Sequence, residues 1–500
     1  MKSGHIHLIG ICGTAMASLA GMLKHRGFHV TGSDAAAYPP MSDFLAGLGI
    51  EVSQPFAEAN LIPHPDLVVI GNALSRGNVE VEYVLDERLP FTSMAALVQQ
   101  EFLRGKEVLT VAGTHGKTTT TSMLAWIFHV AARRPSFLIG GIAENFGSSF
   151  AVSEGGEFIL EGDEYDTAFF DKGPKFMHYF PDGLILTSVE FDHADIYRSL
   201  DEIKTAFKRL VNLVPRRGRI IAWDEQGSAD QSVGIAGRSG DLDQDRTGGS
   251  VSECVSRALC TVERYGFGEN SAWRVRDVRY EPHQTRWRVE RHGQPWAEFK
   301  FALAGEFNVL NATAAAALAA GYGVDSATIG EALCSFRSVK RRLEVKAEID
   351  GITVIDDFAH HPTAIAVTLK ALRTRFAGCR LWAILEPRSN TLRRNVFQQE
   401  LVESLMNADE VVLASVYFKQ NDALGPKERL DVDAVVAELR RRGRNARQFA
   451  DADAIVSGIA GELQSGDVVA ILSNGGFGGI YEKLPARLRQ RSPGTLAGSE

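Results

Sequence analysis

A loop between two glycines, followed by a lysine and threonines, has the chemistry needed to bind phosphate. In the run Val111-Ala-Gly-Thr-His-Gly-Lys-Thr-Thr-Thr120, Gly113 and Gly116 allow backbone amides to converge on an anion. Lys117 then faces the outer phosphates of a nucleoside triphosphate, and the Thr118 hydroxyl can ligate Mg²⁺. A full Walker motif has a glycine five positions before the second one, where this chain has valine. The run therefore predicts a shortened phosphate-binding loop.

The segments on both sides of this loop predict the elements that hold it in place. Glu107-Val-Leu-Thr-Val-Ala112 is an apolar strand, and the stretch from Thr119 to Val130 has apolar residues at helical spacing. A loop that opens a helix places a bound anion at the positive end of the helix dipole. A purely structural glycine turn is the alternative, and the Gly-Lys-Thr-Thr sequence disfavours it.

Acidic residues follow the next predicted strand, within Glu157-Phe-Ile-Leu-Glu-Gly-Asp-Glu-Tyr-Asp166. Carboxylates beside a bound nucleotide are the ligands that hard magnesium ions require. We expect Mg²⁺ to bind there, with an acid-rich solvated loop as the alternative. The acids in question are Glu161, Asp163, Glu164 and Asp166.

A further strand, Leu184 to Val189, ends in Glu190-Phe-Asp-His193. An imidazole at the end of a strand in the same domain as the phosphate loop is a candidate second metal contact. A hydrogen-bonded core histidine explains His193 equally well, so both readings stay open.

Two polar groups nearer the C-terminus are candidate nucleotide contacts. Asn308 and Asn311 precede an alanine-rich helix and can hydrogen-bond an adenine, although asparagine also caps helices. The basic run Val339-Lys-Arg-Arg-Leu-Glu344 lies where two domains join, so a guanidinium can reach a phosphate across the cleft. A solvated basic linker is the alternative.

The N-terminus has the pattern of a Rossmann half. The strand His5 to Ile9 leads into Gly10-Ile-Cys-Gly13, a helix follows, and the next strand ends near Asp34, about 20 residues after the turn. Cysteine occupies the place of the second glycine in the dinucleotide fingerprint, and alanine the place of the third. We therefore expect a phosphate or nucleotide contact other than a redox nicotinamide.

Strand and helix patterns divide the chain into three domains of an α/β protein. We expect a Rossmann-like domain at 1–106, a central phosphate-loop ATPase domain with a parallel sheet at 107–339, and a second Rossmann-like domain at 340–500. Residues 224–252 are poor in large apolar groups and predict a flexible insertion. Tyr265 to Phe301 alternates as antiparallel strands do, with its tryptophans in packing roles.

Composition restricts the classes of function. The 500 residues carry a formal charge of -8 without a basic run, which disfavours a nucleic-acid partner. Neither a membrane span nor a signal peptide is indicated, so we expect a soluble cytoplasmic protein. The five cysteines lack zinc-finger or Cys-x-x-Cys spacing and indicate neither a metal site nor a disulfide.

Taken together, the motifs resemble the Mur ligase family, whose members use ATP to join an amino acid or peptide to a UDP-linked muramyl carboxylate. The resemblance covers nearly the whole chain, because the motifs occur in the family's order. They are Gly113 to Thr119, Glu161-Gly-Asp-Glu, Glu190-Phe-Asp-His193, Asn308-x-x-Asn311, Arg341-Arg-Leu-Glu344 and Asp356-Asp-Phe-Ala-His-His-Pro362.

Finer matches imply a particular reaction within the family. They imply that the tripeptide L-alanyl-gamma-D-glutamyl-meso-diaminopimelate is joined to UDP-N-acetylmuramate through an acyl phosphate in peptidoglycan recycling. The alternative is the L-alanine ligase of peptidoglycan synthesis. The segments that carry this match are Gly71 to Asn78, Phe169 to Lys172, Leu385 to Thr391 and Ser473 to Ile480.

The resemblance also implies roles for individual residues. Lys117, Glu161 and His193 are the expected catalytic residues, and Thr118, Glu161 and His193 the Mg²⁺ ligands. The UDP-sugar would contact Gly10, Cys12, Gly13, Thr14, Asp34, Ser75 and Asn78. ATP would contact Gly113, Thr114, His115, Gly116, Lys117, Thr118, Thr119, Asn308, Asn311, Arg342, Asp357 and His360. The acidic peptide would contact Arg388, Ser389 and Asn390.

The chain departs from the family pattern in two places. Some relatives use a carbamylated lysine beside the metal, and neither Lys204 nor Lys208 can be assigned that role. The usual Gly-x-His-Asn is Gly305-Glu-Phe-Asn308 here, so the histidine contact is absent. We expect a monomer or weak homodimer.

Overall fold

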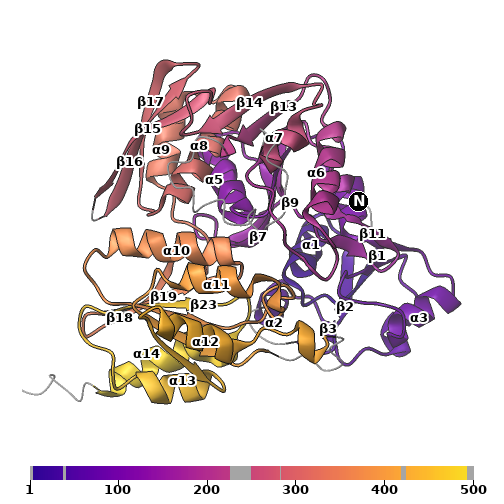
Figure 1. Ribbon diagram of the computed structural model, residues 1–500. Helices are drawn as coiled ribbons and strands as arrows, with labels where there is room; N and C mark the ends of the chain where they lie inside the picture. Colours follow the sequence, from indigo (N-terminus) through magenta and orange to yellow (C-terminus); the bar gives the residue numbers. More distant parts are fainter. Residues whose placement is uncertain (1–3, 38–40, 226–248, 282, 418–423, 492–500) are drawn as a thin grey trace, which may run out of the picture.

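Three large β-sheets follow one another along the chain in the computed structural model (Figure 1). The structure describes residues 4–37, 41–225, 249–281, 283–417 and 424–491. We keep the domain boundaries near 106 and 339 as a proposal, since both fall between the last strand of one sheet and the first strand of the next. No helix in this described part of the chain combines the length and apolar character needed to cross a bilayer.

The first sheet is parallel, with the strand order β3-β2-β1-β4-β5. Because the strand order reverses beside β1, the turn after β1 lies at the kind of crevice where Rossmann folds bind nucleotides. The strands are β1 (His5–Ile9), β2 (His29–Ser33), β3 (Val52–Ser53), β4 (Leu67–Ile70) and β5 (Phe91–Ser93). The α-helices are α1 (Thr14–His25), α2 (Met41–Gly47), α3 (Val79–Asp86) and α4 (Met94–Val98).

The central sheet is mixed, with the order β17-β16-β15-β14-β13-β12-β6-β9-β7-β8. Strands β15 to β7 of that order run parallel, and β8 pairs antiparallel with β7. Strand β16 pairs antiparallel with both β15 and β17, as expected for the tryptophan-containing segment. The strands are β6 (Glu107–Ala112), β7 (Ser136–Ala143), β8 (Ser148–Ala151), β9 (Glu157–Gly162), β12 (Gly183–Leu186), β13 (Arg219–Trp223), β14 (Thr261–Gly266), β15 (Trp273–Glu281), β16 (Gln284–Arg291) and β17 (Gln294–Phe301). A separate hairpin pairs β10 (Asp166–Ala168) with β11 (Asp171–Pro174).

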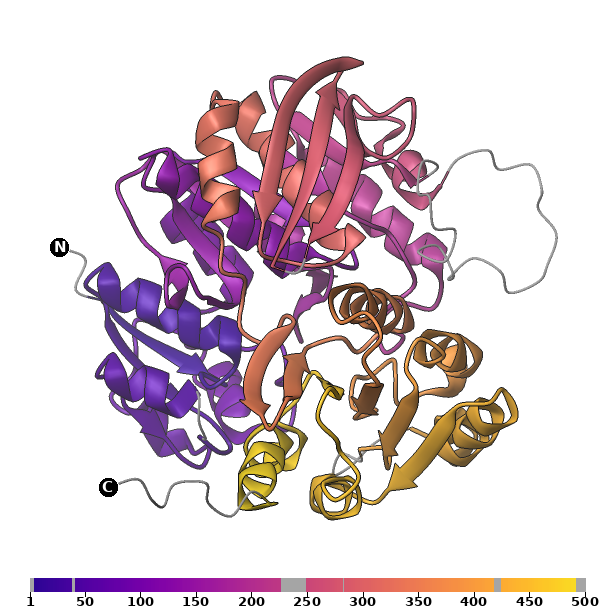
Figure 2. The ribbon, with the colours of Figure 1, turned by 90° about the vertical axis from the view of Figure 1, so that its left-hand side faces the viewer.

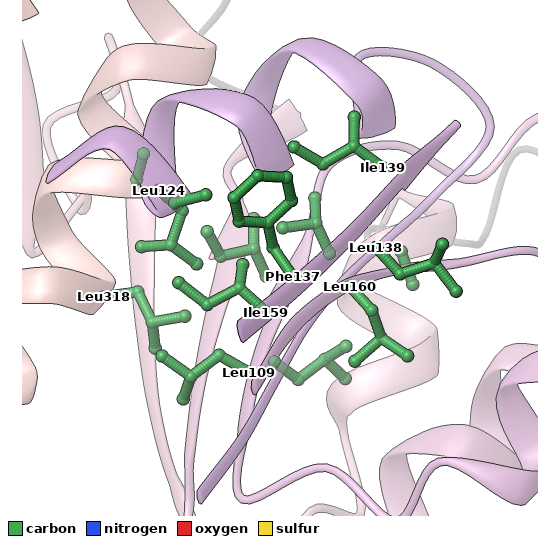
Figure 3. Close-up of a cluster of buried hydrophobic side chains, with 14 of the residues drawn as sticks. Leu109, Leu124, Phe137, Leu138, Ile139, Ile159, Leu160 and Leu318 are labelled. Carbon is green, nitrogen blue, oxygen red and sulfur yellow. The ribbon is translucent and has the colours of Figure 1, made fainter. Parts of the chain in front are cut away.

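Helices α5 (Lys117–Val130) and α8 (Glu306–Gly321) pack on the central sheet around a core of large apolar side chains (Figure 3). Leu109, Ile159 and Phe137 from the sheet meet Leu124 and Leu318 from the helices, and all five are buried. Full burial stabilises by about 1.5–3 kcal/mol per large side chain, so this core holds the loop between β6 and α5 firmly. The remaining helices are α6 (Leu200–Leu213), α7 (Ser250–Val255) and α9 (Ser326–Cys334).

The edges of the predicted insertion are structured, which corrects the expected range of 224–252. Asp224 accepts a hydrogen bond from Ser271 at 2.7 Å, and the Glu225 carboxylate accepts one from the Val251 amide at 2.9 Å. Glu225 thus holds the start of α7, although local composition predicts no helix there. Residues 226–248 lie outside the described residues.

The third sheet has the order β18-β19-β23-β20-β21-β22 and is parallel except for β18. Figure 2 shows this domain below the central domain, beside the first. The strands are β18 (Glu344–Ile349), β19 (Ile352–Asp357), β20 (Leu381–Leu385), β21 (Glu410–Ala414), β22 (Asn445–Phe449) and β23 (Val468–Leu472). The helices are α10 (Pro362–Arg375), α11 (Gln398–Leu405), α12 (Val432–Arg441), α13 (Ala452–Ile459) and α14 (Ile480–Arg491).

Candidate active site

The phosphate loop lies at the carboxyl end of β6 and depends on glycine at two positions. Gly113 has φ 133° and Gly116 has φ 81°, values that disfavour any other residue. A Cβ added to Gly116 would come within 2.6 Å of Asn311 Oδ1 on α8. The loop is therefore closely packed, with its geometry determined by the backbone.

Lys117, the first residue of α5, is held by an acid from the end of β9. Its Nζ donates to Glu164 Oε2 at 2.8 Å and to the Gly113 carbonyl at 2.7 Å. Burial alone would lower the pKa of Lys117, but the carboxylates of Glu164 and Asp163 outweigh it and raise the pKa. The lysine is therefore cationic. Sequence reasoning placed Glu164 in an acid cluster and assigned it no partner.

Thr118 and Glu161 form a pair of oxygen donors beside the loop. The Thr118 hydroxyl donates to Glu161 Oε2 at 3.2 Å, while the Gly140 amide donates to Glu161 Oε1 at 2.6 Å. Burial raises the pKa of Glu161 although the Gly140 amide opposes it. A hydroxyl and a carboxylate at this distance fit a hard cation such as Mg²⁺.

His193 pairs with Glu164 rather than with Glu161. Its Nε2 lies 3.3 Å from Glu164 Oε1 and 4.0 Å from Asp192 Oδ2. Burial lowers the pKa of His193, but the hydrogen bond to Glu164 and the Asp192 charge outweigh it and raise the pKa to about 9. The residue also has φ 54°, a conformation that costs energy and is common at functional sites. Its role as a metal ligand stays a prediction.

The C-terminal domain contributes an arginine to this group. Arg342 Nη2 lies 3.5 Å from Thr118 Oγ1, and its guanidinium carbon lies 5.1 Å from the Phe358 ring centroid. Asp357 Oδ2 accepts from the Leu343 amide at 2.8 Å and so holds the turn that carries the arginine. The segment is therefore not a solvated linker.

His360, Asn308 and Asn311 are the remaining side chains that are expected to contact ATP. Burial lowers the pKa of His360 to about 4, and its Nδ1 lies 2.8 Å from the Phe358 carbonyl oxygen. Asn308 and Asn311 lie buried within α8, whose N-cap is Gly305, so neither side chain caps this helix. Asn308 Nδ2 donates to the Ala304 carbonyl at 2.7 Å. Contacts of either asparagine with adenine stay a prediction.

The expected UDP-sugar residues gather at the carboxyl end of the first sheet. Asp34 Oδ2 accepts from the Cys12 amide at 2.9 Å, and α1 begins at Thr14 after Gly13. Asn78 caps α3 by accepting from the Glu80 amide at 3.0 Å. The Gly10 turn also approaches the loop that precedes α3, because a Cβ added to Gly10 would lie 3.4 Å from Leu74 Cδ1. Contacts of these residues with a UDP-sugar stay a prediction.

The expected peptide residues lie in the loop after β20. The Arg388 guanidinium carbon lies 4.0 Å from the Tyr417 ring centroid, and Nη1 lies 3.3 Å from Glu386 Oε1. Ser389 accepts from the Leu392 amide at 3.0 Å. Asn390 donates to Asp195 of the central domain at 2.7 Å. These bonds hold the loop in place, and recognition of a peptide by it stays a prediction.

Contacts between the central and C-terminal domains make up the part of the site that sequence reasoning missed. The Thr363 hydroxyl donates to Glu190 at 2.7 Å, and the Thr391 hydroxyl donates to Asp192 at 2.8 Å. Helix α10, which follows His361, faces the central domain (Figure 1). Glu190 and Asp192 belong to the Glu190-Phe-Asp-His193 motif, Thr391 ends the segment from Leu385, and Thr363 directly follows Pro362. Their positions in or next to motifs were the available sequence signal.

A phosphate loop, hard oxygen donors and a cation from a second domain define a nucleotide-dependent α/β enzyme. Three family descriptions match consecutive parts of the chain: "Mur ligase family, catalytic domain" at 5–105, "Mur ligase middle domain" at 111–239 and "Mur ligase, glutamate ligase domain" at 341–475. The chain belongs to the Mur ligase family and is a ligase. The resemblance and the α/β fold class expected from sequence are thereby confirmed.

Individual relatives match over nearly the full length. The UDP-N-acetylmuramate--L-alanyl-gamma-D-glutamyl-meso-2,6-diaminoheptandioate ligase of Escherichia coli (strain K12) is 42% identical over 480 residues, 96% of this chain and 97% of that protein. A crystal structure of a murein peptide ligase from Psychrobacter arcticus is 35% identical, with a TM-score of 0.71 over 97% of this chain and 99% of that chain. A UDP-N-acetylmuramate--L-alanine ligase of Geobacter sp. is 30% identical over 489 residues, 98% of each chain.

Proposed function

We propose that this chain joins the tripeptide L-alanyl-gamma-D-glutamyl-meso-diaminopimelate to UDP-N-acetylmuramate, with conversion of ATP to ADP and phosphate. The observation that carries the proposal is the 42% identity to the E. coli tripeptide ligase over 96% of this chain, against 30% for an L-alanine ligase. The reaction belongs to peptidoglycan recycling. We propose that it takes place in the cytoplasm, where ATP and UDP-sugars are made, and that the protein is a monomer or weak homodimer.

The proposed mechanism uses few acid-base groups. The muramyl carboxylate attacks the γ-phosphorus of ATP, the bond to ADP breaks, and an acyl phosphate forms. The peptide amine then attacks the acyl carbon and loses a proton, and phosphate leaves. Lys117 and Arg342 are the cations that stabilise the transferring phosphoryl group, while Glu164 orients Lys117. The hydrogen-bonded domain junction excludes water that would hydrolyse the acyl phosphate.

Mg²⁺ would be held by Thr118 and Glu161, whose oxygens lie 3.2 Å apart, with His193 as a further candidate ligand. Bound there, the ion would neutralise charge on the phosphate oxygens. Glu161 is oriented for this by the Gly140 amide.

A phosphate-release assay tests the proposed acceptor. With ATP, Mg²⁺ and UDP-N-acetylmuramate, we expect rapid phosphate release when the tripeptide is added and little release with free L-alanine. Omission of the UDP-sugar is the control and should abolish release. A preference for L-alanine would move the chain to the other ligase reaction, and release that needs no acceptor would contradict a ligase.

Replacing Arg388 with alanine tests how the peptide is held. We expect the KM for the tripeptide to rise about 10- to 100-fold with little change in the KM for ATP, because hydrogen bonds to a charged group contribute about 1.5–3 kcal/mol. Arg375→Ala is the matched control, since Arg375 also covers an aromatic ring, Phe376, but at the far end of α10. An unchanged tripeptide KM would remove Arg388 from the acceptor site.

A further inference from the structure

Two histidines and a glutamate gather at the junction of the central and C-terminal domains, beside the phosphate loop. One potential ligand atom from each of His115, Glu190 and His361 lies within 4.8 Å of the others. His115 belongs to the phosphate loop, Glu190 follows β12, and His361 is the N-cap of α10. The cluster therefore has ligands from both domains. We propose that these three residues bind a divalent cation of the Zn²⁺ class and hold the two domains together.

The donor set distinguishes this cluster from the Mg²⁺ position. Two imidazoles and one carboxylate are a common set of protein ligands for Zn²⁺, with further coordination left open. Mg²⁺ instead prefers oxygen, which the Thr118 and Glu161 pair supplies. The two donor sets therefore favour different ions.

His361 is already oriented as metal-bound histidines usually are. Its Nε2 lies 3.1 Å from the Phe191 carbonyl oxygen, and a proton on that nitrogen leaves the lone pair on Nδ1. Nδ1 accepts only a long hydrogen bond, 3.3 Å, from the Thr363 amide. Burial lowers the pKa of His361, which keeps the imidazole neutral as a ligand must be.

His115 supplies an unused nitrogen. Its Nε2 is buried and makes no hydrogen bond, although it lies 3.4 Å from Glu190 Oε2. A buried polar atom that makes no hydrogen bond is costly, and a cation would satisfy it. Glu190 itself accepts from Thr363 at 2.7 Å, which orients its carboxylate. The ring centroids of His115 and His361 are 4.8 Å apart.

A cation that needs ligands from both domains binds only when the two domains are in contact. It therefore stabilises the arrangement with the domains in contact by mass action. Because ligases of this kind must open to release product, we expect Zn²⁺ to slow turnover at saturating Mg²⁺. That effect depends on the proposed function, whereas binding of the ion does not.

Titration of the full chain with Co²⁺ in excess Mg²⁺ tests the site by visible ligand-field absorption. We expect one strong site, displaced by Zn²⁺, with affinity at least about 100-fold lower in His361→Gln, since loss of even an outer-shell partner costs 10- to 100-fold. His292→Gln is the matched control, because His292 also lies beside a glutamate, 3.1 Å from Glu263, in the turn between β16 and β17.

Glu190→Gln is a second variant that keeps the side-chain shape, and a Zn²⁺-dependent rise in Tm is a second readout. We expect that rise in the wild type and in His292→Gln, and its loss in His361→Gln and Glu190→Gln. Equal Co²⁺ affinity in wild type and both cluster variants would overturn the proposal. So would the lack of a strong absorption band in the wild type.

Discussion

Replacing Lys117 with alanine is expected to lower kcat/KM about 1,000-fold or more, which corresponds to about 4 kcal/mol of transition-state stabilisation. The physical reason is that Lys117 is the cation of the phosphate loop, and charge develops on the transferring phosphoryl group. Binding of UDP-N-acetylmuramate should change little, because the expected contacts are in another domain. Phosphate release measures the first quantity and calorimetry the second.

The buried partner of Lys117 calls for a second variant. Glu164 is 2% exposed, so Lys117→Ala leaves a buried carboxylate with His193 alone, at a cost to stability of about 3–5 kcal/mol. In the double variant Lys117→Ala/Glu164→Gln, we expect the Tm to recover while activity stays absent. If the double variant recovered activity together with its Tm, Lys117 would act through stability alone. If the single variant Lys117→Ala retained turnover, the assignment of Lys117 to phosphate binding would be wrong.

Arg342→Ala is expected to have the second-largest effect, a fall in kcat of about 1,000-fold with only a small change in Tm. An arginine supplied by another domain to a transferring phosphoryl group contributes 10³ to 10⁵ in rate in comparable enzymes. Arg342 reaches Thr118 at 3.5 Å from the C-terminal domain. Arg342→Lys should not restore the rate, because a lysine cannot reproduce the planar fork. Single-turnover kinetics would measure the phosphoryl-transfer step.

The neighbouring arginine is the matched control. Arg341 donates to Asp356 at 3.1 Å, to the Ser473 carbonyl at 2.7 Å and to the Tyr481 hydroxyl at 2.6 Å, all within the C-terminal domain. Arg341→Ala should therefore destabilise that domain by roughly 2 kcal/mol or more, a fall in Tm of about 4–8 °C. If both variants lost stability and rate in the same proportion, Arg342 would have no separate role in phosphoryl transfer.

The parallel strands could be predicted well from sequence because they are buried on both faces. Such strands are continuous apolar runs that end at polar or glycine residues. β1 and β6 begin and end where the sequence predicts, at His5–Ile9 and Glu107–Ala112. Helix α7 could not be predicted in the same way, because its start depends on the Glu225 carboxylate rather than on local composition.

The site could be predicted only within each motif. The pairing of Thr118 with Glu161 follows from two strands that end at one edge of a sheet, which sequence patterns indicate. Contacts such as Asn390 with Asp195 depend on how two domains dock, and periodicity carries no information about that. His193 and Glu164 lie in one domain but follow different strands, β12 and β9, and sequence reasoning considered the two residues separately.

The position of β23 has a consequence for biosynthesis. This strand, Val468–Leu472, lies between β19 and β20 in the middle of the third sheet, although it is the last strand to be synthesised. The first two sheets can form on the ribosome while β19 and β20 still lack their shared neighbour. A chain that terminates before Val468 would keep its phosphate loop but expose the unpaired edges of two apolar strands, and we expect it to aggregate or be degraded.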